Sequence, residues 1–169
     1  ENVVTQFYPA LGIALSTYCG QNLGAGRIER IRKGFKSGLF IIIAYSVFAL
    51  VAIYFIAEPL SYIFVDKNTT SIEVIDMAVQ YSIIVSYFFI PLGMIFIYRS
   101  GSQGLGSGSI PMISSITELI LRVVSVMILP SLIGYVGICL ASPFAWIGAG
   151  FILPVFAYAH IRKLEKSFS

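Results

Sequence analysis

The sequence predicts an all-α membrane protein that crosses the bilayer as five transmembrane helices. Hydrophobic residues make up 57% of the 169 positions and charged residues only 11%, and the mean hydropathy is +0.89. This content of charge is too low to cover the surface of a soluble domain of this length. A helix needs about 20 apolar residues to cross a bilayer, and the chain has five stretches of that kind. We therefore expect lipid to replace water around much of the surface.

The limits of the expected spans follow from charged residues, glycines and prolines. After the first span, Gly24 and Gly26 predict a helix stop in the left-handed conformation. Pro91 predicts a kink in the third span, because proline has no N–H to continue the helix. Pro111 and Pro130 are expected to open and close the fourth span. The five spans are expected at about residues 3–23, 37–57, 77–98, 111–130 and 136–160.

The basic residues predict the orientation of these spans. Lys and Arg predominate in the loops on the cytoplasmic side of membrane proteins. Residues 24–36 are strongly basic, whereas residues 58–76 are mainly acidic. We therefore expect the loops at 24–36 and 99–111 and the C-terminus inside, and 58–76 outside. An odd number of spans then leaves the N-terminus outside, so a further helix is expected upstream. Nine of the eleven basic residues are placed inside: Arg27, Arg30, Arg32, Lys33, Lys36, Arg99, Arg162, Lys163 and Lys166.

Two local patterns predict contacts of the helices. Within residues 27–36, three apolar side chains recur on one helical face among basic residues, which predicts a short helix lying in the membrane interface. Gly12, Ser16 and Gly20 lie four residues apart, and such a stripe of small residues permits close contact between helices. The three apolar residues of the first pattern are Ile28, Ile31 and Phe35.

Two glycine-rich strings stand at the inner ends of the first and third spans. Neither has the Lys-Ser/Thr of a Walker loop or the fingerprint of a dinucleotide site after a strand. We interpret each string as a helix stop followed by a tight turn, and their similarity suggests two helical hairpins related by an internal repeat. The strings are Gly20-Gln21-Asn22-Leu23-Gly24-Ala25-Gly26-Arg27 and Ser102-Gln103-Gly104-Leu105-Gly106-Ser107-Gly108.

The first string, followed by Glu29-Arg30 and Arg32-Lys33-Gly34, resembles the junction after helix eight of multidrug and toxic compound extrusion (MATE) transporters. Residues 103–106 before Pro111 resemble the family's turn after helix ten, and Glu118-Leu119 with Arg122 resembles its helix eleven. The resemblance covers essentially the whole chain. It implies most of the C-terminal six-helix lobe of a twelve-helix protein, whose two lobes alternate access to a central cavity.

The resemblance also implies an activity. It implies part of a cation-coupled antiporter that exports organic cations, drugs or toxic compounds, in which Na⁺ or H⁺ couples and no further cofactor is needed. The implied partners are the bilayer, a small organic substrate and the missing N-terminal helices of the same chain, but no nucleic acid. The implied location is a bacterial plasma (inner) membrane. One branch of the family carries an acidic residue in helix ten, which residues 88–94 lack, so no coupling carboxylate is carried over.

The candidate functional residues lie in the third and fourth spans. Glu118 and Arg122 stand four residues apart on one helical face, about 10 and 17 Å from the inner end of the span. Charges inside a membrane mark a path for substrate or ions, and an ion pair that fastens helices explains the same spacing. We expect both side chains to face inward. Gln80, Tyr81 and Tyr87 are expected either to line a cavity that receives a flat organic cation or to pack between helices.

Other classes of function fit the residues less well. The sequence predicts no catalytic set and no metal site, because the spans lack converging nucleophiles, bases and ligands. A channel would need rings of charge or a carbonyl filter. A flippase for lipid-linked oligosaccharides has a related architecture with a cationic cavity, for which Arg122 is a candidate. A structural membrane subunit without transport activity is a further alternative.

Overall fold

The computed structural model describes residues 2–64 and 72–168, and all elements within them are α-helices. Residues 65–71, in the loop expected outside the membrane, lie outside the described residues. The all-α fold class is thereby confirmed. The helices are α1 (Asn2–Thr5), α2 (Phe7–Gly24), α3 (Ile28–Phe64), α4 (Ile72–Ser86), α5 (Phe89–Gly104), α6 (Ser109–Ile133) and α7 (Tyr135–Phe168).

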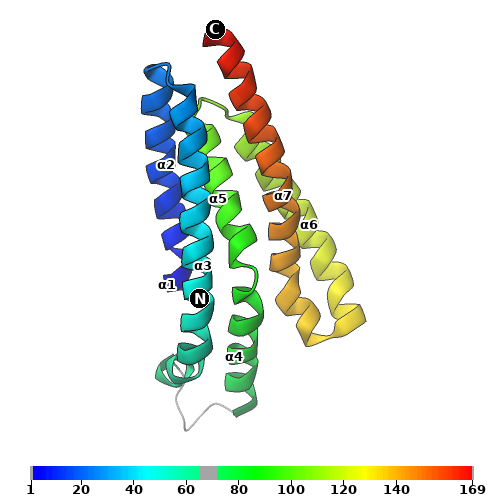
Figure 1. Ribbon diagram of the computed structural model, residues 1–169. Helices are drawn as coiled ribbons and strands as arrows, with labels where there is room; N and C mark the ends of the chain where they lie inside the picture. Colours follow the sequence, from blue (N-terminus) through cyan, green and yellow to red (C-terminus); the bar gives the residue numbers. More distant parts are fainter. Residues whose placement is uncertain (1, 65–71, 169) are drawn as a thin grey trace.

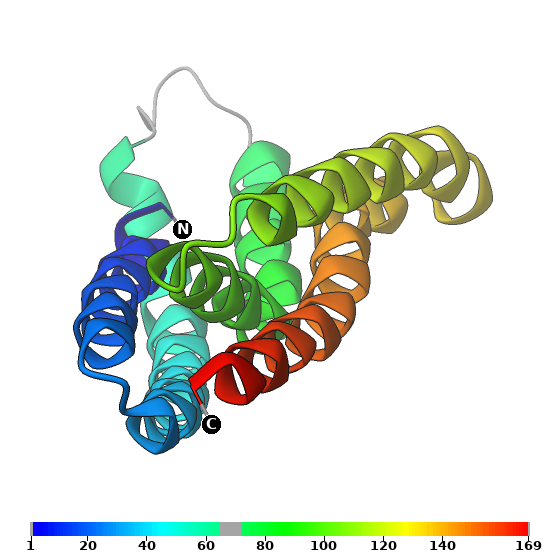
Figure 2. The ribbon, with the colours of Figure 1, turned by 90° about the horizontal axis from the view of Figure 1, so that it is seen from above.

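Helix α5 lies at the centre of the bundle. It packs against α2, α3, α6 and α7, and Figure 2 shows α2, α3 and α7 around it. Helix α6 starts beside α5 and extends away from it along α7, its main neighbour (Figure 1). Helix α4 packs on α3 and α7. The outer face of α6 is left uncovered and is apolar, with Leu119, Met127 and Leu132 each more than 60% exposed.

Four segments of the described chain are long and apolar enough to cross a membrane. Three are the single helices α3, α6 and α7, and the fourth is the bent pair α4–α5. They correspond to the second to fifth expected spans. The first expected span corresponds to α1 and α2, in which Gln21 and Asn22 lower the hydropathy of an 18-residue helix. Its membrane crossing therefore stays a prediction.

Residues 27–36 do not form a separate interfacial helix. Residues 28–36 are the first turns of α3, which continues without a break for 37 residues, about 55 Å at 1.5 Å per residue. The expected amphipathic face is present, but it packs on the bundle instead of on lipid headgroups. Ile31 and Phe35 are fully buried, and the Phe35 ring stacks on Tyr98 of α5 at 5.5 Å between centroids.

Both glycine-rich strings end helices with the same turn. Gly26 and Gly106 adopt φ of +67° and +77°, which glycine reaches without a steric penalty. After each helix two N–H groups bond back to carbonyls in the pattern of a Schellman motif: Arg27 to Asn22 at 2.8 Å and Gly26 to Leu23 at 2.9 Å, then Ser107 to Ser102 at 3.0 Å and Gly106 to Gln103 at 2.9 Å.

The repeated turn differs in register from the repeated sequence. Matching Gln21 to Gln103 aligns Gly24 with Gly106, whereas the structure equates Gly26 with Gly106. The two strings therefore use different glycines for the left-handed residue. The side chains of Gln21 and Gln103 are exposed in both turns, so the two glutamines contribute to these turns through their backbone carbonyls, which accept bonds from Ala25 and Gly106.

Proline shapes the third and fourth spans differently from each other. Helices α4 and α5 meet at a 54° bend around residues 87–88. The break lies where the carbonyl four residues before Pro91 would need an N–H donor, which confirms the expected kink and explains its place. In α6, Pro130 does not end the helix, which continues to Ile133 and stops at Gly134 with φ of +58°.

Small residues bring α2 and α5 into close contact. A Cβ atom added to Gly12 would lie 2.7 Å from Ser100 Oγ and 3.2 Å from the Phe96 carbonyl oxygen. A Cβ atom added to Gly104 would overlap the backbone of Ser16. The stripe expected from the sequence is thus the contact face of α2, and it packs against Ser100 and Gly104 of α5.

Replacing Gly104 should therefore destabilise the protein. We expect Gly104→Ala to cost about 1–3 kcal/mol of unfolding free energy, because backbone atoms cannot yield to a methyl group as a flexible side chain does. Gly24→Ala is the matched control, since nothing lies within 4 Å of its added Cβ atom. Thermal or denaturant unfolding in detergent measures both. Equal stability of the two variants would contradict the close contact.

Candidate functional site

Three charged side chains of α5 and α6 form one group, which we name the charged cluster: Arg99, Glu118 and Arg122. Glu118 Oε1 accepts a bond from Arg122 at 2.6 Å, and Oε2 accepts one from Arg99 at 2.9 Å. Arg99 also donates to Ser114 Oγ at 2.9 Å. The expected pair of Glu118 and Arg122 is present, and a second arginine joins it. One carboxylate thus bridges two guanidinium groups.

Burial differs among the three members of the charged cluster. The side chains of Glu118 and Arg99 are 19% and 24% exposed, whereas that of Arg122 is 44% exposed. Glu118 points toward α5, as expected, and Arg122 keeps nearly half of its surface open. Glu118 lies nine residues after the start of α6 at Ser109, about 14 Å along the helix axis. The inner end of the fourth span is predicted near Ser109, so this prediction places Glu118 inside a hydrocarbon layer of about 30 Å.

The hairpin of α5 and α6 brings the charged cluster together. Helix α5 ends at Gly104 and α6 begins at Ser109, so residues equally far from this short turn face each other. Arg99 and Ser114 stand five residues from their ends of the turn, and they are bonded. Glu118 and Arg122 follow Ser114 at four-residue steps on the same face of α6.

The role of Arg99 was not predicted from the sequence. Arg99 was expected in a cytoplasmic loop at 99–111, but α5 extends through Gly104, and the connection is limited to residues 105–108. The signal that could have found it is the register of the hairpin. Counting residues outward from the connection between α5 and α6 places Arg99 opposite Ser114. Glu118 is one helical turn beyond Ser114 and is therefore within reach of Arg99.

The polar and aromatic residues of the third span lie in different surroundings from the charged cluster. Gln80 is exposed on α4, and Tyr81 is partly buried and packs against the apolar core. Tyr87, which is 62% exposed, lines a pocket of about 140 Å³ between α3 and α4. The pocket is smaller than the 300–1,000 Å³ typical of sites for drug-sized ligands. It is lined by Leu50, Val51, Tyr54, Phe55, Ile83, Ser86 and Tyr87.

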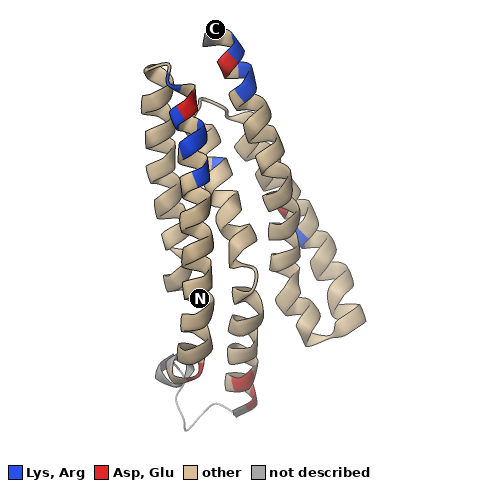
Figure 3. Ribbon diagram, viewed as in Figure 1, with Lys and Arg blue, Asp and Glu red and all other residues tan. Residues whose placement is uncertain are grey.

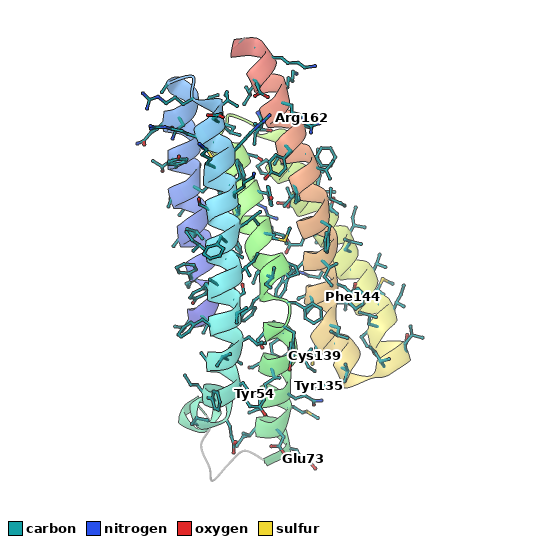
Figure 4. The ribbon with its side chains drawn as sticks, viewed as in Figure 1. Tyr54, Glu73, Tyr135, Cys139, Phe144 and Arg162 are labelled. Carbon is teal, nitrogen blue, oxygen red and sulfur yellow. The ribbon has the colours of Figure 1, made fainter. Side chains whose placement is uncertain are left out.

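Basic residues predominate at one end of the bundle. Figure 3 shows most of them near the end where the C-terminus lies, among a few acidic residues, and it shows only acidic residues of α3 and α4 at the other end. Figure 4 shows Arg162 and Glu73 at these opposite ends. At the basic end, Arg32 of α3 donates to Glu165 of α7 at 2.6 Å. His160 of α7 lies 3.3 Å from the Leu105 carbonyl, at the turn after α5.

The charged cluster has a formal surplus of one positive charge, because it contains two arginines and one glutamate. This surplus can attract an anion. In residues 2–64 and 72–168, no three His, Cys, Asp or Glu side chains come together in a way that could hold a metal ion. Cys19 and Cys139 are both buried and unbonded to each other.

Comparisons with known proteins point to one family. The MatE family model matches residues 2–128, which is more than half of the chain. A protein of Shewanella oneidensis described as a FAD transporter is 25% identical to the chain over 144 residues. The match covers 85% of this chain and 31% of that protein, so the chain spans about a third of its relative's length. No solved structure matches the chain.

Removing one member of the charged cluster should cost more than removing a surface ion pair. In a protein that contains this chain, we expect Glu118→Gln to lower the unfolding free energy by about 2–4 kcal/mol, because both guanidinium groups lose their counter-charge. Adding Arg122→Met to this variant should recover part of the loss. Unfolding in detergent measures the cycle.

The matched control for this cycle is Glu165→Gln. It removes the exposed partner of Arg32 and should cost less than about 1 kcal/mol. Strictly additive losses for Glu118→Gln and Arg122→Met would show that the two side chains do not depend on each other.

Proposed function

The chain belongs to the MatE family, and from this premise we propose that it forms part of a secondary active transporter that exports small organic compounds in exchange for a cation. The observation that carries the proposal is the family match over residues 2–128 of an apolar helical bundle. The activity belongs to a longer protein, since alternating access needs two lobes that move around a shared site. We expect these 169 residues alone to be inactive in transport.

The proposed cargo is an organic cation, drug or toxic compound, as the resemblance to MATE transporters implies. Aromatic faces attract such cations, and Tyr54 and Tyr87 offer them at the pocket between α3 and α4. A second candidate is a flavin dinucleotide, because the Shewanella oneidensis relative is described as a FAD transporter. The excess of arginine over glutamate in the charged cluster favours this second candidate.

The proposed coupling ion is Na⁺ or H⁺. Glu118 is the only carboxylate within the five expected spans, which supports it as a residue on the ion path. Both of its oxygens are engaged by arginines, which supports a structural role equally well. Gln80, Tyr81 and Tyr87 are proposed for the substrate path on their polar and aromatic character alone. A lipid flippase and a structural subunit stay as alternatives.

Export should depend on a cation gradient. Inverted membrane vesicles that contain the full-length protein should transport ethidium when a Na⁺ or H⁺ gradient is imposed, because the exchange of ions supplies the free energy. Collapsing the gradient with a matching ionophore should stop the transport, and vesicles without the protein provide the baseline. Gradient-independent movement of the dye would contradict antiport.

We further propose a bacterial plasma membrane with the basic end of the bundle in the cytoplasm. Arg30 is exposed in the first turn of α3, at the basic end of the bundle, and Glu73 is exposed in the first turn of α4, at the opposite end (Figure 4). An impermeant maleimide added to intact cells should label the variant Glu73→Cys and spare Arg30→Cys, since positive loops stay inside. The native cysteines are buried, which keeps the background low. Labelling of Arg30→Cys alone would reverse the orientation.

A further inference from the structure

The charged cluster has donors and positive charge that Glu118 does not satisfy. Each arginine bonds Glu118 through one terminal nitrogen, Nη2. A guanidinium group carries five N–H donors, so most of the donors are not used by Glu118. The Nε atoms of Arg99 and Arg122 are buried and have no hydrogen-bond partner among the described residues. Two positive charges face one negative charge. A hydrogen-bond acceptor with a negative charge would bond the unused donors and balance the surplus positive charge.

The depth of the charged cluster makes this deficit costly. Unpaired charge in the hydrocarbon region is expensive even on lenient scales, and a buried donor without a partner adds a penalty for lost hydration. A neutral or cationic ligand would leave both costs in place. An anion removes the cost of the unpaired charge, so the electrostatics favour an anionic ligand over a cationic one. The two Nε atoms have almost no accessible surface in this arrangement, so they would bond the ligand only after the arginines move.

The geometry favours a phosphate over a single carboxylate. The single carboxylate of Glu118 offers only one oxygen to each arginine. A phosphate or pyrophosphate group has more oxygens and can meet the planar forks of both guanidinium groups in bidentate fashion. Arg122, at 44% exposure, leaves one side of the charged cluster open to such a group, and the hydroxyl group of Ser114 lies beside Arg99.

We propose that Arg99 and Arg122 form a binding site for a phosphate or pyrophosphate group, with Glu118 as an internal counter-ion that the ligand displaces. With the site empty, Glu118 holds the arginines together. When the anion enters, it takes over both guanidinium groups and Glu118 leaves one or both of them. The proposal rests on the transporter function only for the source of the anion, which is the pyrophosphate of a soluble dinucleotide or of a lipid headgroup.

Binding by the purified full-length protein tests the site without transport. The probes are FAD and inorganic pyrophosphate, and ethidium is the cationic control. Titration calorimetry measures the binding of all three, and quenching of flavin fluorescence also measures the binding of FAD. We expect Glu118→Gln to bind the phosphate probes about tenfold more tightly, because the internal competitor is gone. Ethidium binding should not tighten.

Two further variants keep the test independent of folding. Arg122→Lys retains the charge and the pair with Glu118 but loses the planar fork, so it should weaken the binding of pyrophosphate about tenfold. Arg32→Gln removes an arginine from the exposed pair with Glu165 and should leave affinity unchanged. If Arg122→Lys and Arg32→Gln bind alike, or if Glu118→Gln weakens binding, the site is overturned.

The source of the anion follows from a comparison of two preparations. Loss of FAD binding after reconstitution of the protein into nanodiscs that contain a polyprenyl pyrophosphate lipid, but not into nanodiscs of phosphatidylcholine alone, assigns the site to a lipid headgroup. Binding of FAD that persists in both kinds of nanodisc assigns it to a soluble dinucleotide. Absence of binding to every phosphate probe overturns the proposal, even if gradient-driven export of ethidium succeeds. Failure of export with intact phosphate binding overturns the proposed function instead.

Discussion

The close packing of α5 against its neighbours is the constraint on which the other features depend. In hydrocarbon, apolar side chains gain little by leaving lipid for protein, so helices associate through close contact and through polar bonds. Here the small residues of α2 and α5 allow the two backbones to touch at Gly104 and Ser16. That contact fixes α5 in the centre of the bundle, and with it the position of Arg99 relative to α6.

The charged cluster shows how a membrane helix accommodates charge. Glu118 and Arg122 form an ion pair along α6, and the charges of this pair alone would balance. Arg99 joins from α5 and makes the group both a link between two helices and a surplus of positive charge. The link joins the two helices, and the surplus supports the proposed binding of an anion. One set of residues can thus connect helix packing with the recognition of cargo, because a ligand that displaces Glu118 also changes how α5 and α6 are joined.

The sequence predicted the features that rest on local chemistry. Long apolar stretches identified four segments that the structure contains, Gly26 marked a helix stop, and Pro91 marked a bend. The stripe of Gly12, Ser16 and Gly20 predicted a close helix contact, which the structure shows against α5. Features that rest on the partner of a residue were missed. The start of α3 packs on the bundle through contacts such as that of Phe35 with Tyr98, and the role of Arg99 depends on the register of a hairpin.

The glycine turn between α5 and α6 sets the register of these two helices, and this register positions the charged cluster. Gly106 stops α5 in the left-handed conformation and leaves only residues 105–108 for the connection, so the register of the hairpin has little freedom. Each residue on a helix is turned by about 100° from the previous one, and a change of one residue in the turn would rotate Glu118 away from Arg99. The first hairpin has the same Schellman turn at Gly26 but no charged pair across it. The turn is therefore a scaffold for the register, and the residues one and two turns beyond it determine whether the hairpin carries a charged site.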